Sequence, residues 1–148
     1  MQIIKDKQIV PNDWIYVDNE TEIGDQGNIT VSLDRWKNHH QQCLNHSGKR
    51  GVRLTSTDNV NDLSDTLNSL DLIELDFPGF GDGRIFSQAR LLRTRLGYQG
   101  EIRATGHFLA DQVFYLMRVG VNAFQLENEQ QLPLALSCMN DFSVTYQP

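Results

Sequence analysis

The chain has 148 residues, a mass of 16.9 kDa and 39% apolar residues, which is the size and composition of one globular domain. Its 13 basic and 19 acidic side chains give a net charge of -6. This acidic balance argues against nucleic-acid or anionic-membrane binding, because both favour a basic surface. The sequence has no apolar run near the roughly 18 residues that span a membrane and begins with no signal-peptide core, so we expect a cytoplasmic protein.

Two cysteines limit the redox chemistry that the chain can support. Cys43 and Cys138 are the only thiols, and the sequence contains no C-x-x-C motif. A thioredoxin-like site is therefore not expected, and two thiolates are too few for an iron–sulfur cluster. The histidine and cysteine spacings also do not resemble a zinc site. We expect two core cysteines, no metal and no cofactor.

The chain divides into a small N-terminal β-rich extension at residues 1–33 and a βα-repeat domain at residues 34–148, which together form one globular unit. In the extension, strands are expected at residues 14–17 and 29–33. The later expected strands are residues 52–55, 72–77, 101–105 and 121–126, and the expected helices are residues 34–44, 60–70, 83–96, 109–119 and 132–140. The short connections between them predict right-handed crossovers and an α/β fold with a mostly parallel sheet.

The strand faces favour a curled sheet over one that helices cover on both sides. Glu74 and Asp76 alternate with apolar residues in the strand at residues 72–77, and Arg53 and Arg103 alternate in the same way in the neighbouring strands. A parallel sheet covered on both faces has nearly continuous apolar strands. One face is therefore wet, or its charges neutralise each other, with Arg53, Glu74 and Arg103 side by side. This pattern favours a half-barrel-like sheet with a polar concave face; a flavodoxin-like sheet is the alternative.

Parallel α/β sheets bind ligands beyond the carboxyl ends of their strands, where this chain carries the run FPGFGDGR at residues 77–84. Asp76 and Asp82 are candidate catalytic acids or bases there, and Gly83 and Arg84 are candidates for anion binding at the helix start. The run lacks the third glycine of a dinucleotide fingerprint, so dinucleotide binding is not supported. The alternative is a tight turn in which Asp82 caps the helix.

Arginines are concentrated between residues 84 and 118, where the chain has six arginines and two acidic residues. Arg90 and Arg93 share one side of the expected helix, and Arg103 and Arg118 follow on later elements. Such a patch binds an anionic ligand or docks an acidic partner. The alternative is a solvated surface with scattered ion pairs.

His107 follows the expected strand at residues 101–105, and Asp111 lies four residues later, at helical spacing. A histidine and a carboxylate in this arrangement can shuttle protons, so both residues are catalytic candidates. The spacing shows no partner nucleophile, and a surface histidine is the alternative.

Four motifs, FPGFGDGR (77–84), SQARLLRTRLGYQGEIRATG (87–106), DQ (111–112) and RVGVNAF (118–124), together resemble a bacterial family known as domain of unknown function nine-three-four. The resemblance covers roughly residues 31–128. Members of that family are typically encoded beside assimilatory sulfite reductase and are sometimes labelled oxidoreductase, so the resemblance implies a setting in sulfur assimilation. Ile85 stands where the family commonly has glycine, and Asn122 replaces a common aspartate, which argues against a phosphate-cradling loop and against a catalytic acid at position 122. His107 lies outside the family pattern.

These observations lead to one expected function and two alternatives. The leading expectation is an accessory protein of assimilatory sulfite reduction, whose Asp-Gly-Arg loop and arginine-rich helix engage an acidic partner such as sulfite reductase, or a small anion. The first alternative is a small (βα) enzyme that acts on an anionic metabolite with strand-end carboxylates and arginines. The second is a structural domain that forms a homodimer through an open sheet edge.

Overall fold

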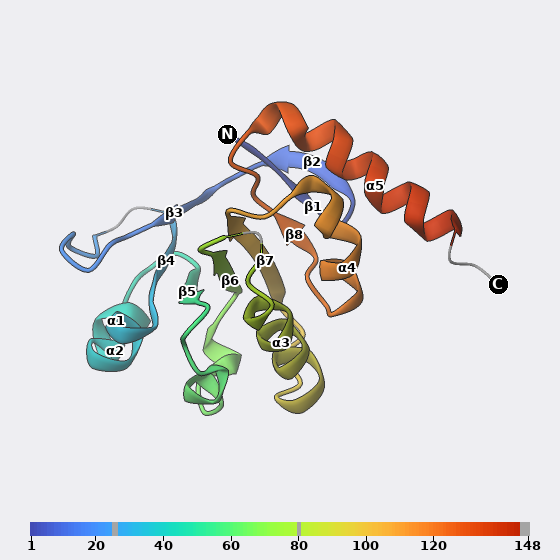
Figure 1. Cartoon of the computed structure of the whole chain (residues 1–148). Helices are drawn as coiled ribbons and strands as arrows, with labels where there is room; N and C mark the ends of the chain where they lie inside the picture. Colours follow the sequence, from blue (N-terminus) through green and yellow to red (C-terminus); the bar gives the residue numbers. More distant parts are fainter. Residues whose placement is uncertain (25–26, 80, 146–148) are drawn as a thin grey trace.

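The computed structural model describes residues 1–24, 27–79 and 81–145, with side chains up to residue 140. Within these ranges, eight strands form one curled sheet in the order β2-β1-β8-β7-β6-β5-β4-β3 (Figure 1). Strand β1 is antiparallel to β2 and β8, and the other neighbouring pairs are parallel. The strands are β1 (Gln2–Lys5), β2 (Gln8–Pro11), β3 (Trp14–Tyr16), β4 (Asn28–Ser32), β5 (Arg50–Thr55), β6 (Leu72–Phe77), β7 (Glu101–Gly106) and β8 (Ala123–Phe124).

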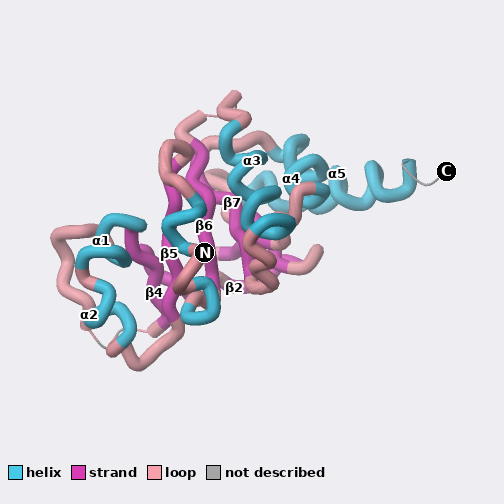
Figure 2. Tube along the Cα trace, turned by 90° about the horizontal axis from the view of Figure 1, so that it is seen from below, coloured by secondary structure: helices cyan, strands magenta, loops and turns pink. Residues whose placement is uncertain are grey.

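The helices lie along the outer face of this sheet, with α1 against β4 and β5 and α3 against β6 (Figure 2). Helix α5 packs on α4 and on β1. The α-helices are α1 (Leu33–Asn38), α2 (His40–Leu44), α3 (Arg84–Arg90), α4 (Val113–Arg118) and α5 (Leu132–Thr145). The 3-10 helices are η1 (Val60–Leu63), η2 (Leu67–Ser69), η4 (Ala110–Gln112) and η5 (Glu129–Gln131), and η3 (Leu91–Arg95) is a π-helical turn. In the part of the chain that the structure describes, every helix is too short or too polar to cross a membrane.

The apolar core lies between the helices and the outer face of the sheet. Leu54, Leu75 and Ile102 come from adjacent strands and pack in one cluster with Ile85 of α3 and Leu116 of α4, and all five are fully buried. Each side chain of this size stabilises the fold by roughly 1.5–3 kcal/mol when it is removed from water. The opposite, concave face carries the charged residues of the same strands. This arrangement confirms the α/β fold and the half-barrel-like sheet over the flavodoxin-like alternative.

Two expected helices are each divided into two shorter ones. Residues 60–70 fold as η1 and η2 instead of one α-helix, and residues 34–44 form α1 and α2 with a break at His39. The apolar spacing of residues 60–70 is helical, but the polar positions are Asn, Asp, Ser and Thr. One of these side chains bonds to the nearby backbone: Thr66 Oγ1 donates to the Leu63 carbonyl at 3.4 Å. Such local bonds compete with the α-helical pattern.

The expected helices at residues 83–96 and 109–119 are only partly α-helical. The first continues after Arg90 as the π-helical turn η3, in which the Leu96 amide donates to the Leu91 carbonyl at 3.0 Å. The second begins with the 3-10 helix η4 before α4. A π-helical turn has more residues per turn than an α-helix, so it moves the side chains after Arg90 around the helix axis.

The N-terminal residues form a β-hairpin that the sequence pattern does not predict. Strands β1 and β2 are joined by Asp6 and Lys7, which have φ of 50° and 66°. The hairpin adds to β8 at one edge of the sheet, whereas β3 and β4 form the other edge. Residues 1–33 therefore contribute both edges of one continuous sheet. The domain boundary at residue 33 stays a prediction.

Candidate functional site

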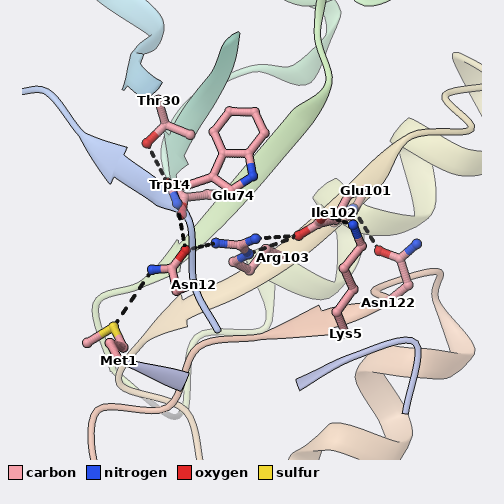
Figure 3. A network of polar contacts seen from close by, with 10 residues as sticks. All are labelled: Met1, Lys5, Asn12, Trp14, Thr30, Glu74, Glu101, Ile102, Arg103 and Asn122. Atoms are coloured by element: carbon pink, nitrogen blue, oxygen red, sulfur yellow. Dashed lines mark hydrogen bonds and ion pairs between the residues drawn. The ribbon is translucent and has the colours of Figure 1, made fainter. Parts of the chain in front are cut away.

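The charged residues of the concave face form a buried polar network (Figure 3). Glu74 of β6 is only 2% exposed, and one of its oxygens accepts hydrogen bonds from Thr30 Oγ1 at 2.8 Å and from Arg53 Nε at 3.0 Å. The guanidinium of Arg53 also stacks over the Tyr16 ring, 4.2 Å from its centroid. Burial is the main cause that raises the pKa of Tyr16. These contacts neutralise Glu74 within the network.

Arg103 of β7 is the second buried charge of this face, and its side chain is 1% exposed. Its Nε and Nη2 atoms donate to Glu101 Oε2 at 3.0 and 2.7 Å, and its Nη1 donates to Asn12 Oδ1 at 3.0 Å. Lys5 Nζ lies 3.1 Å from the other Glu101 oxygen. Figure 3 shows Asn12 in the segment that crosses the concave face between β2 and β3.

The strand register places Glu74 directly between Arg53 and Arg103, as the alternation of the strands predicts. The sequence leaves two alternatives for these charged residues, exposure to water or neutralisation by each other, and the structure shows the second. The N-terminal segment covers the network, so Arg103 is buried in the middle of the sheet instead of lying at the strand ends beside Arg84. Its guanidinium is hydrogen-bonded to Glu101 and Asn12, so Arg103 is not part of the candidate binding surface.

In the Asp-Gly-Arg loop at the start of α3, the Arg84 side chain bonds to the Asp82 carboxylate. Arg84 Nε and Nη2 donate to the two Asp82 oxygens at 3.0 and 2.7 Å, and the Arg84 amide also donates to Asp82 Oδ1. The hydrogen bond from the Arg84 side chain is the largest cause that holds the pKa of Asp82 far below its ordinary value. Gly83 has ordinary right-handed φ and ψ, so the loop does not depend on a left-handed glycine there. The carboxylate thus caps the turn and neutralises the arginine.

The other catalytic candidates lie in separate local contacts. Asp76 accepts a hydrogen bond from Thr105 Oγ1 at 2.8 Å across the β6–β7 pair. His107 Nδ1 lies 2.5 Å from Glu127 Oε1, and both side chains are more than half exposed. Asp111 is an exposed residue of η4. The structure therefore pairs His107 with Glu127 at the surface, and no contact joins His107 to Asp111 among the interactions described.

Three of the candidate arginines line one groove between α3–η3 and α4. We call it the arginine groove; it encloses about 550 Å³ and is lined by Phe86, Arg90, Arg93, Thr94, Tyr115, Met117, Arg118, Val119 and Gly120. Arg90 and Arg118 are exposed, one on each wall, and Tyr115 is 47% exposed beside them. The Arg118 guanidinium lies over the Phe114 ring, 5.9 Å from its centroid. Among the described lining residues, none is acidic.

Arg93 forms the fixed part of this groove. Its Nε donates to the Gly120 carbonyl at 2.9 Å, and its Nη1 donates to the carbonyls of Tyr98 and Gly100, both at 2.8 Å. Burial is the main cause that lowers the pKa of this guanidinium. Gly120 lies beneath the side chain with φ of +106°, and a Cβ at this position would overlap the Arg93 side chain. Arg93 therefore ties the η3–β7 loop to the end of α4 and holds the groove walls together.

The sequence pattern does not predict the aromatic and sulfur-containing residues of the groove. Phe86, Tyr115 and Met117 have no motif of their own, and they meet the arginines only because α3 packs beside α4. The one signal in the sequence is the spacing of Tyr115 and Arg118, which places both residues on the same side of a helix. Metal binding has no support from geometry: within the described ranges, no group of three or more His, Cys, Asp or Glu side chains is arranged to hold an ion.

The comparison with known families covers this groove. The family described as "Bacterial protein of unknown function (DUF934)" matches residues 51–148. The match includes every residue of the arginine groove and the Asp82–Arg84 pair, whereas β1 to β4 lie outside it. A search of curated proteins finds no match.

Proposed function

We propose that this chain, which belongs to the bacterial DUF934 family of unknown function, is an accessory protein of assimilatory sulfite reduction that docks an acidic partner in the arginine groove. The observation that carries the proposal is the pair of exposed arginines, Arg90 and Arg118, on facing walls of a groove in which none of the described lining residues is acidic. The setting in sulfite reduction comes from the resemblance of the motifs, and sulfite reductase is the partner that it implies.

The local charge supports an acidic partner in spite of the net charge of -6. Exposed charges act over about 10 Å at 0.1 M salt, so a docking segment senses the groove and not the whole molecule. Arginine and tyrosine are also enriched at protein interfaces, where they bind by paired hydrogen bonds and by burial of their flat side chains. Arg90, Arg118 and Tyr115 provide these groups side by side.

The Asp-Gly-Arg loop has a smaller part in this proposal than the sequence implies. Asp82 neutralises Arg84, so the loop adds little net charge to the surface. The side chain of Arg84 is 61% exposed and remains accessible as a hydrogen-bond donor. The main electrostatic contribution is therefore assigned to Arg90 and Arg118. A role as an enzyme gains no specific support, because Asp82 is paired and Arg103 is buried.

The proposal is tested by mixing the purified protein with the sulfite reductase of the same organism and measuring binding by calorimetry at 20 and 200 mM salt. We expect a complex at low salt that weakens as salt screens the charges, and no complex with the variant Arg90→Glu/Arg118→Glu. Arg95→Glu is the matched control, because Arg95 is an exposed arginine of η3 outside the groove.

Three results would contradict the proposal. One is the absence of a complex and of any effect on sulfite reductase turnover at low salt. Another is a complex that the double variant keeps. The third is equal weakening by Arg95→Glu, which would show that overall charge, and not the groove, governs the association.

A further inference from the structure

We propose that the arginine groove continues into an apolar pocket that receives a hydrophobic side chain of the acidic partner segment. This inference rests on the proposed docking function and specifies the partner's chemistry: carboxylates next to one apolar anchor residue. The pocket encloses about 350 Å³ and is lined by Asp6, Lys7, Met117, Gly120, Val121, Asn122, Phe124 and Met139. It lies between the β1–β2 turn, the end of α4 and α5.

The groove and the pocket are neighbours, since Met117 and Gly120 line both. The Arg93 side chain lies over the backbone of Gly120 on the groove side. Arg93 is held by three carbonyl oxygens, so this part of the wall is rigid. Met117 is the one partly buried side chain at the junction that can change its rotamer to admit a ligand.

The pocket is fixed on its other side by the N-terminal hairpin. The Asp6 amide donates to the Asn122 carbonyl at 3.0 Å, which holds the β1–β2 turn beside α4. Val121, Phe124 and Met139 are buried and provide an apolar floor. The two methionines make this lining adaptable in shape, as is typical of surfaces that accept more than one apolar side chain.

The charges of the groove select the occupant. Arg90 and Arg118 lie on the groove side, whereas the charge of Lys7 on the pocket side is offset by Asp6, which also lines the pocket. An extended protein segment with acidic residues next to one leucine, phenylalanine or methionine matches this arrangement. Exposed ion pairs contribute at most about 1 kcal/mol each, so the arginines alone bind weakly, and the buried anchor provides most of the affinity.

The inference is tested with two fluorescein-labelled peptides measured by fluorescence anisotropy at low salt. The first is a run of glutamates with one central leucine, and the second has serine in place of the leucine. We expect the wild-type protein to bind the leucine peptide about tenfold more tightly, as expected for burial of one such side chain. Met139→Gln should remove this preference and keep the binding of the serine peptide, because Met139 lines the pocket and not the groove. Leu134→Gln, an exposed apolar residue of α5 outside the pocket, is the control that should keep the preference.

The outcomes separate this inference from the proposed function. Equal binding of both peptides, lost in Arg90→Glu/Arg118→Glu, overturns the apolar anchor and leaves the arginine groove supported. A leucine preference that Met139→Gln keeps also overturns the anchor site. Binding of neither peptide at millimolar concentration overturns both the anchor and the groove. Circular dichroism of each variant, unchanged from the wild type, excludes unfolding as the cause.

Discussion

Arg103 is the charged residue of the concave face whose removal should cost the most stability. In the variant Arg103→Met, the Glu101 carboxylate, whose side chain is 8% exposed, loses two hydrogen bonds. Among its described partners it keeps only Lys5, whose side chain is 47% exposed. Removal of one partner of a buried ion pair costs about 3–5 kcal/mol, because the other charge stays buried. We expect the free energy of unfolding to fall by this amount, which is a large part of the about 5–15 kcal/mol of a typical domain.

The double variant Glu101→Leu/Arg103→Met separates the buried charge from the loss of packing. With both charges gone, the apolar side chains fill the same space, and such a replacement is often neutral or stabilising. Asn12 Oδ1 keeps the hydrogen bond from the Trp14 amide at 3.0 Å, so it is not left unpaired. We therefore expect the double variant to recover most of the stability that the single variant loses.

The measurement is urea unfolding at pH 7, followed by the fluorescence of Trp14 and Trp36. The matched control is Lys37→Met, which breaks an exposed ion pair with Asp62 at 3.3 Å and should cost less than about 1 kcal/mol. The reasoning is refuted if Arg103→Met costs no more than this control. It is also refuted if the double variant is as unstable as the single one.

Two further predictions concern glycine and the Asp-Gly-Arg loop. Gly120→Ala should lower the free energy of unfolding by more than about 1 kcal/mol, because φ is +106° and the added Cβ would overlap Arg93. The control is Gly97→Ala, which should cost less, because Gly97 has φ of +70° and a Cβ there would have no atom within 4 Å. Equal losses of stability in urea unfolding would contradict the steric reason. Asp82 has a pKa below its ordinary value in the folded protein, so its ionised form stabilises the fold above that ordinary value, and this contribution disappears as the pH falls below about 4. Thermal unfolding between pH 7 and pH 2 should show a smaller loss on acidification for Asp82→Asn than for the wild type, and parallel curves would count against the pairing with Arg84.

The strand–helix alternation predicts most of the sheet, since its signals are local. The strand at residues 72–77 is predicted with the bounds of β6, and the alternation of charges in three strands predicts the curled sheet. The hairpin at the N-terminus is not predicted, because Asp6 and Lys7 have left-handed φ values that such turns usually give to Asn and Gly. The sequence does not predict the 3-10 helices at residues 60–70, because the apolar spacing favours one continuous helix and the local side-chain hydrogen bonds favour short turns.

The candidate site is less predictable than the fold, because it depends on which elements pack together. Arg90 and Arg93 are predicted neighbours, and they do line the same groove, but Arg93 is held by loop carbonyls and only Arg90 is exposed. Arg118 joins them through the packing of α4 beside α3. Arg103 carries the same charge in the sequence and is buried by an N-terminal segment that lies far away in the chain. Charge density along the sequence therefore identifies the surface only once tertiary contacts show which arginines are exposed.

The order of the strands also has a consequence for how the protein is made. Ile4 of β1 pairs with Phe124 of β8, and the hairpin that contains β1 leaves the ribosome before β8 does. Its partner strand follows only after β4 to β7 have been synthesised, so the hairpin must wait without its neighbour while these central strands fold. Until then, Glu101 and Arg103 on β7 lack Lys5 and Asn12, and the concave face stays open to water. We therefore expect this face to be covered late in folding, when the hairpin pairs with β8.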